Sequence, residues 1–240
     1  NGTIWALNTT TVLSKARRYH TSVAYNGYLY VVGGEDSANA LLDDVRYAKI
    51  NSGGTVGNFI TNAMAFTNQR SGHSSVAYNG YLYVIGGKDG TIYYNDVQKA
   101  VINSNGTIGA WAPATATLFT TARSGHSSVV YNGYLYVIGG IDAAGAYLAD
   151  IRYAAITPDG TLATVWNQAA SSFTTARSGH TSVVYNGFLY VIGGYDGTAK
   201  VDVQYAPINV SGTIGGWSNA AVLPSARYNH TSVAYNGYLY

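Results

Sequence analysis

The stretch Tyr78-Asn79-Gly80-Tyr81-Leu82-Tyr83-Val84-Ile85-Gly86-Gly87 occurs five times in this sequence with small changes. Its copies begin at Tyr25, Tyr78, Tyr131, Tyr185 and Tyr235, and the fifth reaches Tyr240, the last residue. The histidines keep the same period, each in the pattern Arg-x-x-His-(Ser/Thr), at His20, His73, His126, His180 and His230. A repeat of roughly 20–50 residues is typical of solenoids and propellers. Because the units show no helical periodicity, we expect an all-β fold with four short strands in each repeat of about 50 residues.

Each copy predicts a β-hairpin followed by a close backbone approach. Asn79-Gly80 lies between two apolar alternating runs, where Asn-Gly indicates a turn whose two central residues take positive φ. In the strand before the first turn, Ser22 and Ala24 fall on one face, and such small side chains suit a strand near a central axis. We interpret the glycine pair as a position without room for a side chain, since no Lys-(Ser/Thr) and no helix follow it as in a phosphate-binding loop.

The order of these motifs divides the chain into units. Strand a precedes Asn-Gly, strand b follows it, strand c begins at Asp-(Val/Ile), and strand d follows a Gly-Thr-Ile-like phrase before an aromatic residue. Asn1-Gly2-Thr3-Ile4-Trp5 has the last pattern, so a strand d is expected first, within residues 1–13. Because each repeat buries its faces against its neighbours, we expect residues 1–240 to be one domain or part of one. Its units are approximately 14–66, 67–119, 120–173 and 174–224, with a partial unit at 225–240.

The glycine pair, the aspartate after it, the strand c tyrosine and the strand d tryptophan together resemble the kelch repeat. The pattern is clearest in Gly193-Gly194-Tyr195-Asp196, Asp202-Val203-Gln204-Tyr205 and Trp217, and it recurs through essentially the whole chain. Since kelch repeats build propeller blades, the resemblance implies a β-propeller of four-stranded antiparallel blades. The sequence departs from the pattern at Lys99, which replaces the strand c tyrosine, and at Phe59, which replaces the strand d tryptophan.

Composition excludes several classes of protein. Charged residues make up 10% of the chain and the net charge is +2, so neither nucleic acid nor an anionic membrane is an expected partner. The absence of cysteine excludes disulfides, thiolate metal sites and a cysteine nucleophile. No apolar run approaches the roughly 20 residues of a membrane helix, so membrane insertion is not expected. Low charge with abundant Gly, Ser, Thr, Asn and Tyr favours, by association, an extracellular or cell-surface bacterial protein.

Antiparallel strands place the b–c and d–a loops on one face of the disc, which we name the variable-loop face because its b–c loops differ between units. The motif arginines are expected there: Arg17, Arg70, Arg123, Arg177 and Arg227. In one interpretation each arginine pairs with an aspartate of its own or the next blade. In the other, the arginines ring the channel mouth and bind a carboxylate or acidic peptide. The kelch resemblance supports the second interpretation, because in some kelch proteins this arginine lines the ligand site.

The variable loops also contain tyrosines that could contact a ligand. Tyr93, Tyr94 and Tyr195 are candidate ligand-binding residues, for example by stacking on a sugar. The histidines are expected to pack or to form hydrogen bonds, since one histidine per blade cannot supply the several ligands that a zinc ion needs. We therefore predict no metal site, no cofactor and no catalytic residue.

The leading hypothesis for function is a non-enzymatic binding scaffold that recognises a protein or a glycan through the variable-loop face. The alternative is a structural spacer or interaction module of a larger surface protein. A glycan-active hydrolase is less favoured, because catalysis requires an asymmetric constellation and the charged residues here mostly follow the repeat. Strand a occurs five times and strand c only four, so we also expect an interior segment of a longer polypeptide. Its open ends would pair with further blades or with another copy.

Overall fold

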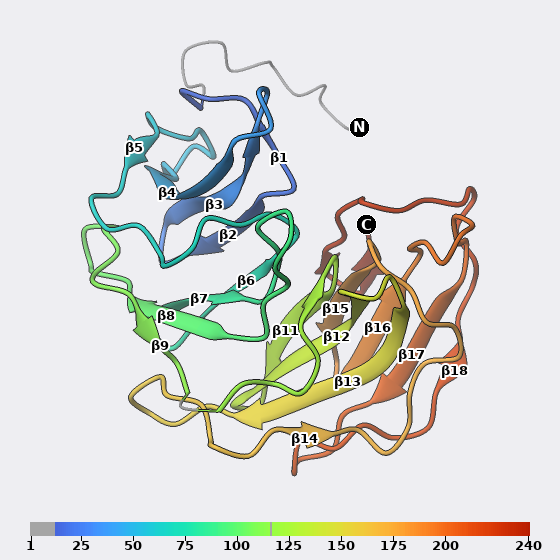
Figure 1. The fold of residues 1–240 in the computed structure, drawn as a ribbon. Coiled ribbons are helices and arrows are strands. Elements are labelled where there is room, and N and C mark those ends of the chain that lie inside the picture. The colour runs from blue at the N-terminus through green and yellow to red at the C-terminus, as the bar shows by residue number, and fades with distance from the viewer. Residues whose placement is uncertain (1–12, 116) are drawn as a thin grey trace.

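The computed structural model describes residues 13–115 and 117–240, which form strands and turns without a helix (Figure 1). Four antiparallel blades and a final two-stranded hairpin follow one another around a common centre in chain order (Figure 1). The all-β propeller of antiparallel blades is therefore confirmed, with four strands in the second and fourth blades and one additional short strand in the first and third. The strand d predicted within 1–13 falls almost entirely outside the described residues. No helix in the described ranges is long and apolar enough to span a membrane.

The blades repeat the same strand order from the centre outward. Blade 1 contains β1 (Arg17–Arg18), β2 (Thr21–Tyr25), β3 (Tyr28–Asp36), β4 (Leu41–Lys49) and β5 (Ile60–Thr61). Blade 2 contains β6 (Ser74–Tyr78), β7 (Tyr81–Ile85), β8 (Val97–Val101) and β9 (Ala112–Pro113). Blade 3 contains β10 (Arg123–Ser124), β11 (Ser127–Tyr131), β12 (Tyr134–Asp142), β13 (Tyr147–Ala155) and β14 (Asn167–Gln168). Blade 4 contains β15 (Thr181–Tyr185), β16 (Phe188–Ile192), β17 (Val203–Pro207) and β18 (Ser218–Asn219), and the final hairpin is β19 (Ala234–Tyr235) with β20 (Tyr238–Leu239).

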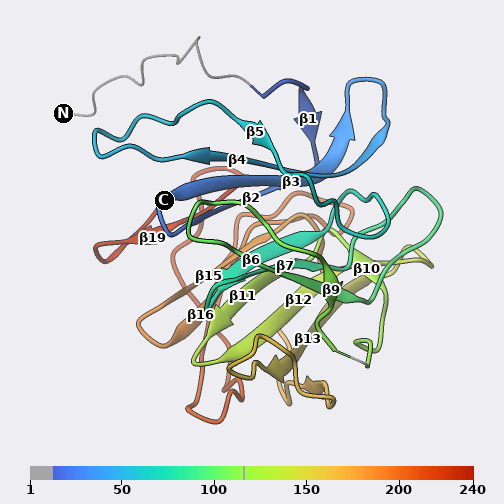
Figure 2. The same ribbon diagram turned by 90° about the vertical axis from the view of Figure 1, so that its left-hand side faces the viewer.

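The first long strand of each blade lies innermost. Strands β2, β6, β11, β15 and β19 contact one another in that order around the centre, as Figures 1 and 2 show from two sides. They enclose a channel of about 430 Å³ whose wall includes Ser22, Ser75 and Ser232. Ser22 lies in this wall, as the alternation predicted, but valines such as Val129 and Val184 line it as well.

The Asn-Gly pairs form the predicted hairpin turns. Asn26 and Gly27 have φ of 49° and 79°, and the other four pairs have nearly the same angles. Positive φ at both positions is the type I′ geometry, which matches the twist of the flanking strands. All five turns lie on the face opposite the variable loops.

The b–c connections differ from the prediction in blades 1 and 3. Strand b was expected to end at the glycine pair, but β3 and β12 continue through it to Asp36 and Asp142, with a register shift at the pair. Each of these aspartates then closes a tight hairpin, because its Oδ1 accepts two backbone N–H groups, from Ala38 and Ala40 in blade 1. Blades 2 and 4 have only single bridges at this place, Lys88 with Tyr93 and Tyr195 with Ala199.

The core lies between blades. Between blades 1 and 2, the apolar side chains of β3 and β4 pack on those of β7 and β8, a cluster that includes Tyr30, Val32 and Val45 with Leu82 and Val84. Burying each large apolar side chain stabilises the fold by roughly 1.5–3 kcal/mol. Each strand d tryptophan also meets a phenylalanine of the preceding unit edge-to-face, with ring centroids 5.5–5.7 Å apart: Trp111 with Phe66, Trp166 with Phe119 and Trp217 with Phe173.

Lys99, one of the two departures from the kelch pattern, still makes an interblade contact. Its Nζ donates hydrogen bonds to the backbone carbonyl of Asp159 at 2.7 Å and to Thr161 Oγ1 at 3.1 Å, both in blade 3. The same ammonium group lies 5.0 Å from the ring centroid of Tyr81. Lysine thus replaces the tyrosine without leaving the interface open.

Candidate binding face

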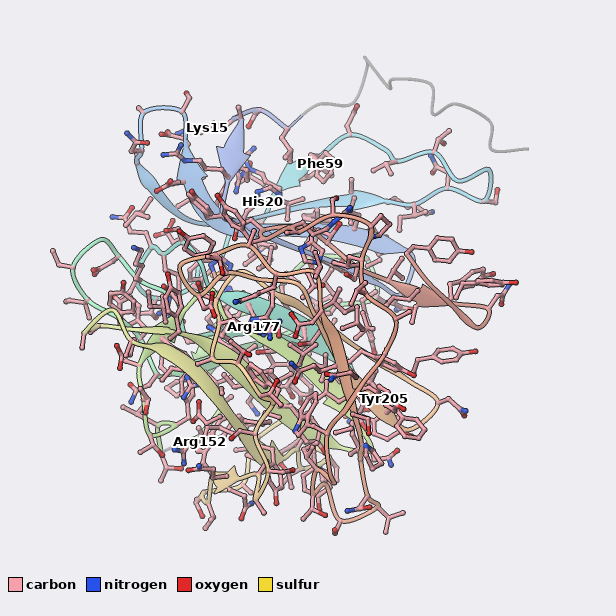
Figure 3. The ribbon with its side chains drawn as sticks, turned by 90° about the vertical axis from the view of Figure 1, so that its right-hand side faces the viewer. Lys15, His20, Phe59, Arg152, Arg177 and Tyr205 are labelled. Atoms are coloured by element: carbon pink, nitrogen blue, oxygen red, sulfur yellow. The ribbon has the colours of Figure 1, made fainter. Side chains whose placement is uncertain are left out.

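The motif arginines are built into the blades. Arg70 has no exposed surface, and its guanidinium donates to both carboxylate oxygens of Asp96 at 2.6 and 3.2 Å and to Gly86 O at 2.9 Å. Its remaining donors reach the backbone carbonyls of Thr67 and Asn68. The same bidentate pairing within one blade joins Arg17 to Asp44, Arg123 to Asp150 and Arg177, labelled in Figure 3, to Asp202.

Burial and hydrogen bonding act in opposite directions on the pKa of three of these aspartates, Asp44, Asp150 and Asp202. For Asp150, burial favours the neutral form, but hydrogen bonds from Arg123 and Arg152 outweigh it and hold the pKa below its usual value. Asp44 and Asp202 are shifted in the same direction for the same reasons. A ligand carboxylate could reach these four arginines only by displacing the aspartate, so their role in ligand binding stays a prediction.

Arg227 occupies the same motif position in a different environment. It is exposed, and its guanidinium donates only to Ser225 within the described residues, at 3.3 Å to the carbonyl and 2.8 Å to the hydroxyl. The five motif arginines lie in successive units, and four of the five are committed to their own blades. The structure therefore does not bring them together into a shared site.

The glycine pair and the arginine backbone link neighbouring blades. Gly87 N donates to Arg123 O at 2.9 Å, and equivalent bonds join Gly34 to Arg70, Gly140 to Arg177 and Gly194 to Arg227. A Cβ on Gly86 would lie 2.8 Å from His126 Cε1 and 3.0 Å from Arg123 O. The pair is thus required by close backbone approach, as the sequence indicated.

The histidines form a polar ladder between the inner strands. His126 Nε2 lies 2.9 Å from Ser74 Oγ of the preceding blade, and that hydroxyl also lies 2.6 Å from Ser128 Oγ. His73, His180 and His230 make the same contact with Thr21, Ser127 and Thr181. Burial, with a smaller contribution from the neighbouring arginine, lowers the pKa of His73 and of His180 to about 3. We name these arginines, aspartates, histidines and glycines the buried ring; its parts are occupied with one another.

Three positions per blade stand above the buried ring on the variable-loop face. They are the residue after the motif arginine, the residue after the glycine pair, and the residue that pairs with the latter across the b–c hairpin. We name each set a rim row. The rows are Arg18, Glu35 and Leu41 in blade 1; Ser71, Lys88 and Tyr93 in blade 2; Ser124, Ile141 and Tyr147 in blade 3; and Ser178, Tyr195 and Ala199 in blade 4.

The rim rows of blades 1 and 2 are charged. Arg18 Nε donates to Glu35 Oε1 at 2.6 Å, and Arg18 Nη2 donates to Asn39 Oδ1 at 2.6 Å. In blade 2, Lys88 Nζ lies 5.5 Å from the ring centroid of Tyr93. Both candidate cations on this side are thus already engaged within the chain.

Tyr94, the second candidate tyrosine in blade 2, is also held internally. Its hydroxyl donates to Asp89 Oδ2 at 2.6 Å, and the Arg70 guanidinium carbon lies 4.2 Å from its ring centroid. Burial and this hydrogen bond raise the pKa of Tyr94 to about 12. The residue therefore supports the Arg70 pair as much as it faces the surface.

The rim of blades 3 and 4 is aromatic. The Tyr195 ring centroid lies 6.2 Å from that of Tyr147 in blade 3 and 5.1 Å from that of Tyr228, with interplanar angles of 70° and 47°. We name these three residues the tyrosine shelf; Tyr228 is 51% exposed. Sequence reasoning found Tyr195 but missed Tyr147 and Tyr228. Comparing the rim positions from unit to unit would have found them, because Tyr228 follows a motif arginine where other units have Ser or Arg.

A pocket of about 370 Å³ lies beside β8 and β9. Its wall includes Thr67, Gln98, Pro113 and Leu118, and Asp96 is the ionisable residue among its lining side chains. Because Asp96 accepts both bonds from Arg70, the pocket supplies no unengaged acid–base pair of the kind a hydrolase needs.

The comparisons with known proteins agree with this architecture. The family model described as the kelch motif matches residues 16–47, 69–99, 122–153 and 176–205, more than half of the chain. Among curated proteins, beta-scruin of Limulus polyphemus is 30% identical over 146 residues, and Kelch-like protein 33 of Homo sapiens is 32% identical over 130 residues. These matches cover 54% and 52% of this chain but only 14% and 22% of the relatives.

Two further similarities bear on the fold. The leucine-zipper-like transcriptional regulator 1 homolog of Drosophila melanogaster is 28% identical over 154 residues, covering 60% of this chain and 15% of that protein. The solved structure of YjhT superimposes with a TM-score of 0.72, covering 93% of this chain and 76% of the other at 18% identity. At that identity the likeness concerns the fold alone.

Proposed function

The chain belongs to the kelch-repeat family, and from that premise we propose that it is a non-enzymatic binding scaffold that recognises a protein through its rim rows. Rigid scaffolds commonly carry recognition on their loops. Here the scaffold is the buried ring, which repeats from blade to blade, while the rim rows change from charged to aromatic. Localisation outside the cell stays a prediction from composition.

One observation carries the proposal: blades 1 and 3 have the same b–c hairpin but different rim residues. Asp142 Oδ1 accepts hydrogen bonds from Ala144 N and Ala146 N, each at 2.9 Å, as Asp36 does in blade 1. Yet this hairpin carries Glu35 and Leu41 in one blade and Ile141 and Tyr147 in the other. Since the backbone geometry is the same, the hairpin itself requires neither set of side chains.

Binding to a peptide array and a glycan array tests the proposal. We expect saturable binding to particular peptides that falls about tenfold in the double variant Tyr147→Leu, Tyr195→Leu, because aromatic side chains dominate interface energetics. Val210→Ser, at a residue 90% exposed on the opposite face, should leave binding unchanged.

Other results would replace the proposal. Peptide binding that survives the double variant, or that is lost in Val210→Ser, contradicts recognition through the rim rows. Binding to glycans alone would mean that the same face recognises sugars instead of a protein, a ligand class that the tyrosine shelf also suits. The absence of any saturable ligand would favour the structural spacer.

A further inference from the structure

We propose that the tyrosine shelf binds a cationic side chain, arginine or lysine, of a partner protein. This inference rests on the proposed function and adds the chemistry of the partner. It begins from a difference between equivalent rim positions in blades 2 and 3.

Tyr93 and Tyr147 are equivalent rim residues with different neighbours. In blade 2 the residue after the glycine pair is Lys88, whose Nζ lies 5.5 Å from the Tyr93 ring centroid. In blade 3 that residue is Ile141, which pairs with Tyr147 across the hairpin. Tyr93 therefore has a cation from its own rim row, whereas Tyr147 has none.

Elsewhere in this molecule, three further tyrosine rings lie near cations. Arg70 lies over Tyr94, Lys99 over Tyr81 and Arg18 over Tyr19, at 4.2, 5.0 and 5.4 Å from the ring centroids. Within residues 13–115 and 117–240, no such lysine or arginine lies over the three rings of the shelf, and residues 1–12 contain neither residue type. Tyr147 thus lacks the cation that its equivalent in blade 2, Tyr93, has.

The shelf geometry suits a cation from outside the chain. Its rings meet at 70° and 47°, so their faces point in different directions and a single group can lie near more than one of them. A cation is attracted to an aromatic face within about 6 Å of its centroid. Because the ring centroids are 6.2 and 5.1 Å apart, a group that lies against the exposed side of one ring is also close to its neighbour.

Acidic residues lie in the hairpins that carry the shelf. Asp142 uses Oδ1 for the N–H groups of Ala144 and Ala146, and its Oδ2 has no hydrogen-bond partner within the described ranges. Asp196 follows Tyr195 directly and accepts a hydrogen bond from Thr198 N. The nearby cations are engaged, Lys200 with Asp196 at 2.7 Å and Arg227 with Ser225. These carboxylates add negative charge to the two hairpins that carry Tyr147 and Tyr195.

The test supplies the missing cation from within the chain. In Ile141→Lys, the new ammonium group is placed against Tyr147 as Lys88 is against Tyr93, and it should compete with the partner's cation. The matched control is Val210→Lys, which makes the same change of residue and net charge at an exposed site on the opposite face. The probe is each fluorescein-labelled peptide selected on the peptide array, together with its copies carrying citrulline for arginine or norleucine for lysine.

We expect anisotropy titrations to show that Ile141→Lys binds the selected peptides roughly tenfold more weakly than the parent chain does. The neutral peptide copies should bind the parent chain more weakly by a similar factor, and Val210→Lys should bind the selected peptides as the parent chain does. Peptides that lose binding to the Tyr147→Leu, Tyr195→Leu variant but tolerate citrulline, norleucine and Ile141→Lys overturn the cation inference and leave the proposed function standing. Selection of acidic peptides, or equal losses in both lysine variants, also overturns it. If no peptide depends on the shelf tyrosines, both the inference and the proposed function fail.

Discussion

The buried ring and the rim rows lie within a few residues of each other along the chain, yet they differ in what limits their sequence. Arg123 and Ser124 pair with Asp142 and Ile141 across blade 3: Arg123 is fully buried with its donors occupied, whereas Ile141 of the rim row is half-buried. Each residue of the buried ring forms hydrogen bonds with a neighbour, so a substitution there leaves a buried partner without a hydrogen bond. Residues of the rim contact mainly one another, as Arg18 does Glu35 and Lys88 does Tyr93, and they vary from blade to blade.

Lowering the pH tests the contribution of the buried ring to stability most strongly. The unfolded chain binds protons at its histidines below about pH 6.5, whereas His73 and His180 have a pKa of about 3 in the fold and the pKa of His126 is also well below its usual value. The unfolded state therefore binds more protons as pH falls, and each buried histidine lowers the free energy of unfolding by up to about 1.4 kcal/mol per pH unit between about 6.5 and 3. Urea titrations from pH 7.5 to 4.5 should show this loss.

A histidine variant shows whether the buried histidines cause the pH dependence of the free energy of unfolding. His126→Asn should reduce the pH dependence of the free energy of unfolding by about a fifth to a third, since three histidines are fully buried and the pKa values of His20 and His230 are lowered as well. The aspartates with lowered pKa values add to the loss only below about pH 5, so the slope is taken between pH 7.5 and 5. An unchanged slope would show that the ladder histidines are not the groups that titrate.

The arginines provide a matched pair inside one motif. Arg123→Met removes donors to Asp150, Gly139 O and Thr121 O from a fully buried site, and breaking a buried ion pair costs roughly 3–5 kcal/mol. Arg227→Met, at the same motif position but exposed, should cost about 0.5 kcal/mol or less. Chemical denaturation measures both, and comparable losses would contradict the assignment of the buried ring to stability.

The sequence predicted the elements whose information is local. Asn-Gly turns, alternating strands and the glycine pair each follow from neighbouring residues, and all three have the predicted geometry. Whether each motif arginine pairs with an aspartate of the chain or with a ligand carboxylate could not be predicted from neighbouring residues. It depends on the distance across the blade, which places Asp150 beside Arg123. Tyr147 and Tyr228 meet Tyr195 from two other units, a contact that depends on how blades pack and so has no local signal.

A smaller effect separates backbone geometry from side-chain contact. Gly133 has φ of 76° in its turn, and the nearest atom to an added Cβ would be Tyr78 Oη at 4.0 Å, so conformation rather than space is limiting. Gly133→Val should therefore cost about 2 kcal/mol, because a β-branched residue is strained at positive φ. Ala146→Val, in an exposed hairpin, should change the free energy of unfolding by about 0.5 kcal/mol at most. Equal denaturation midpoints would refute the turn assignment.

The most direct measurement compares stability and binding in one variant. Tyr147→Leu with Tyr195→Leu removes two rings of the tyrosine shelf and leaves the buried ring intact. We expect the double variant to have a free energy of unfolding within about 1 kcal/mol of that of the parent chain and to bind peptide roughly tenfold more weakly. A large loss of stability, or full binding by the folded variant, would contradict the division between a structural ring and a recognition rim.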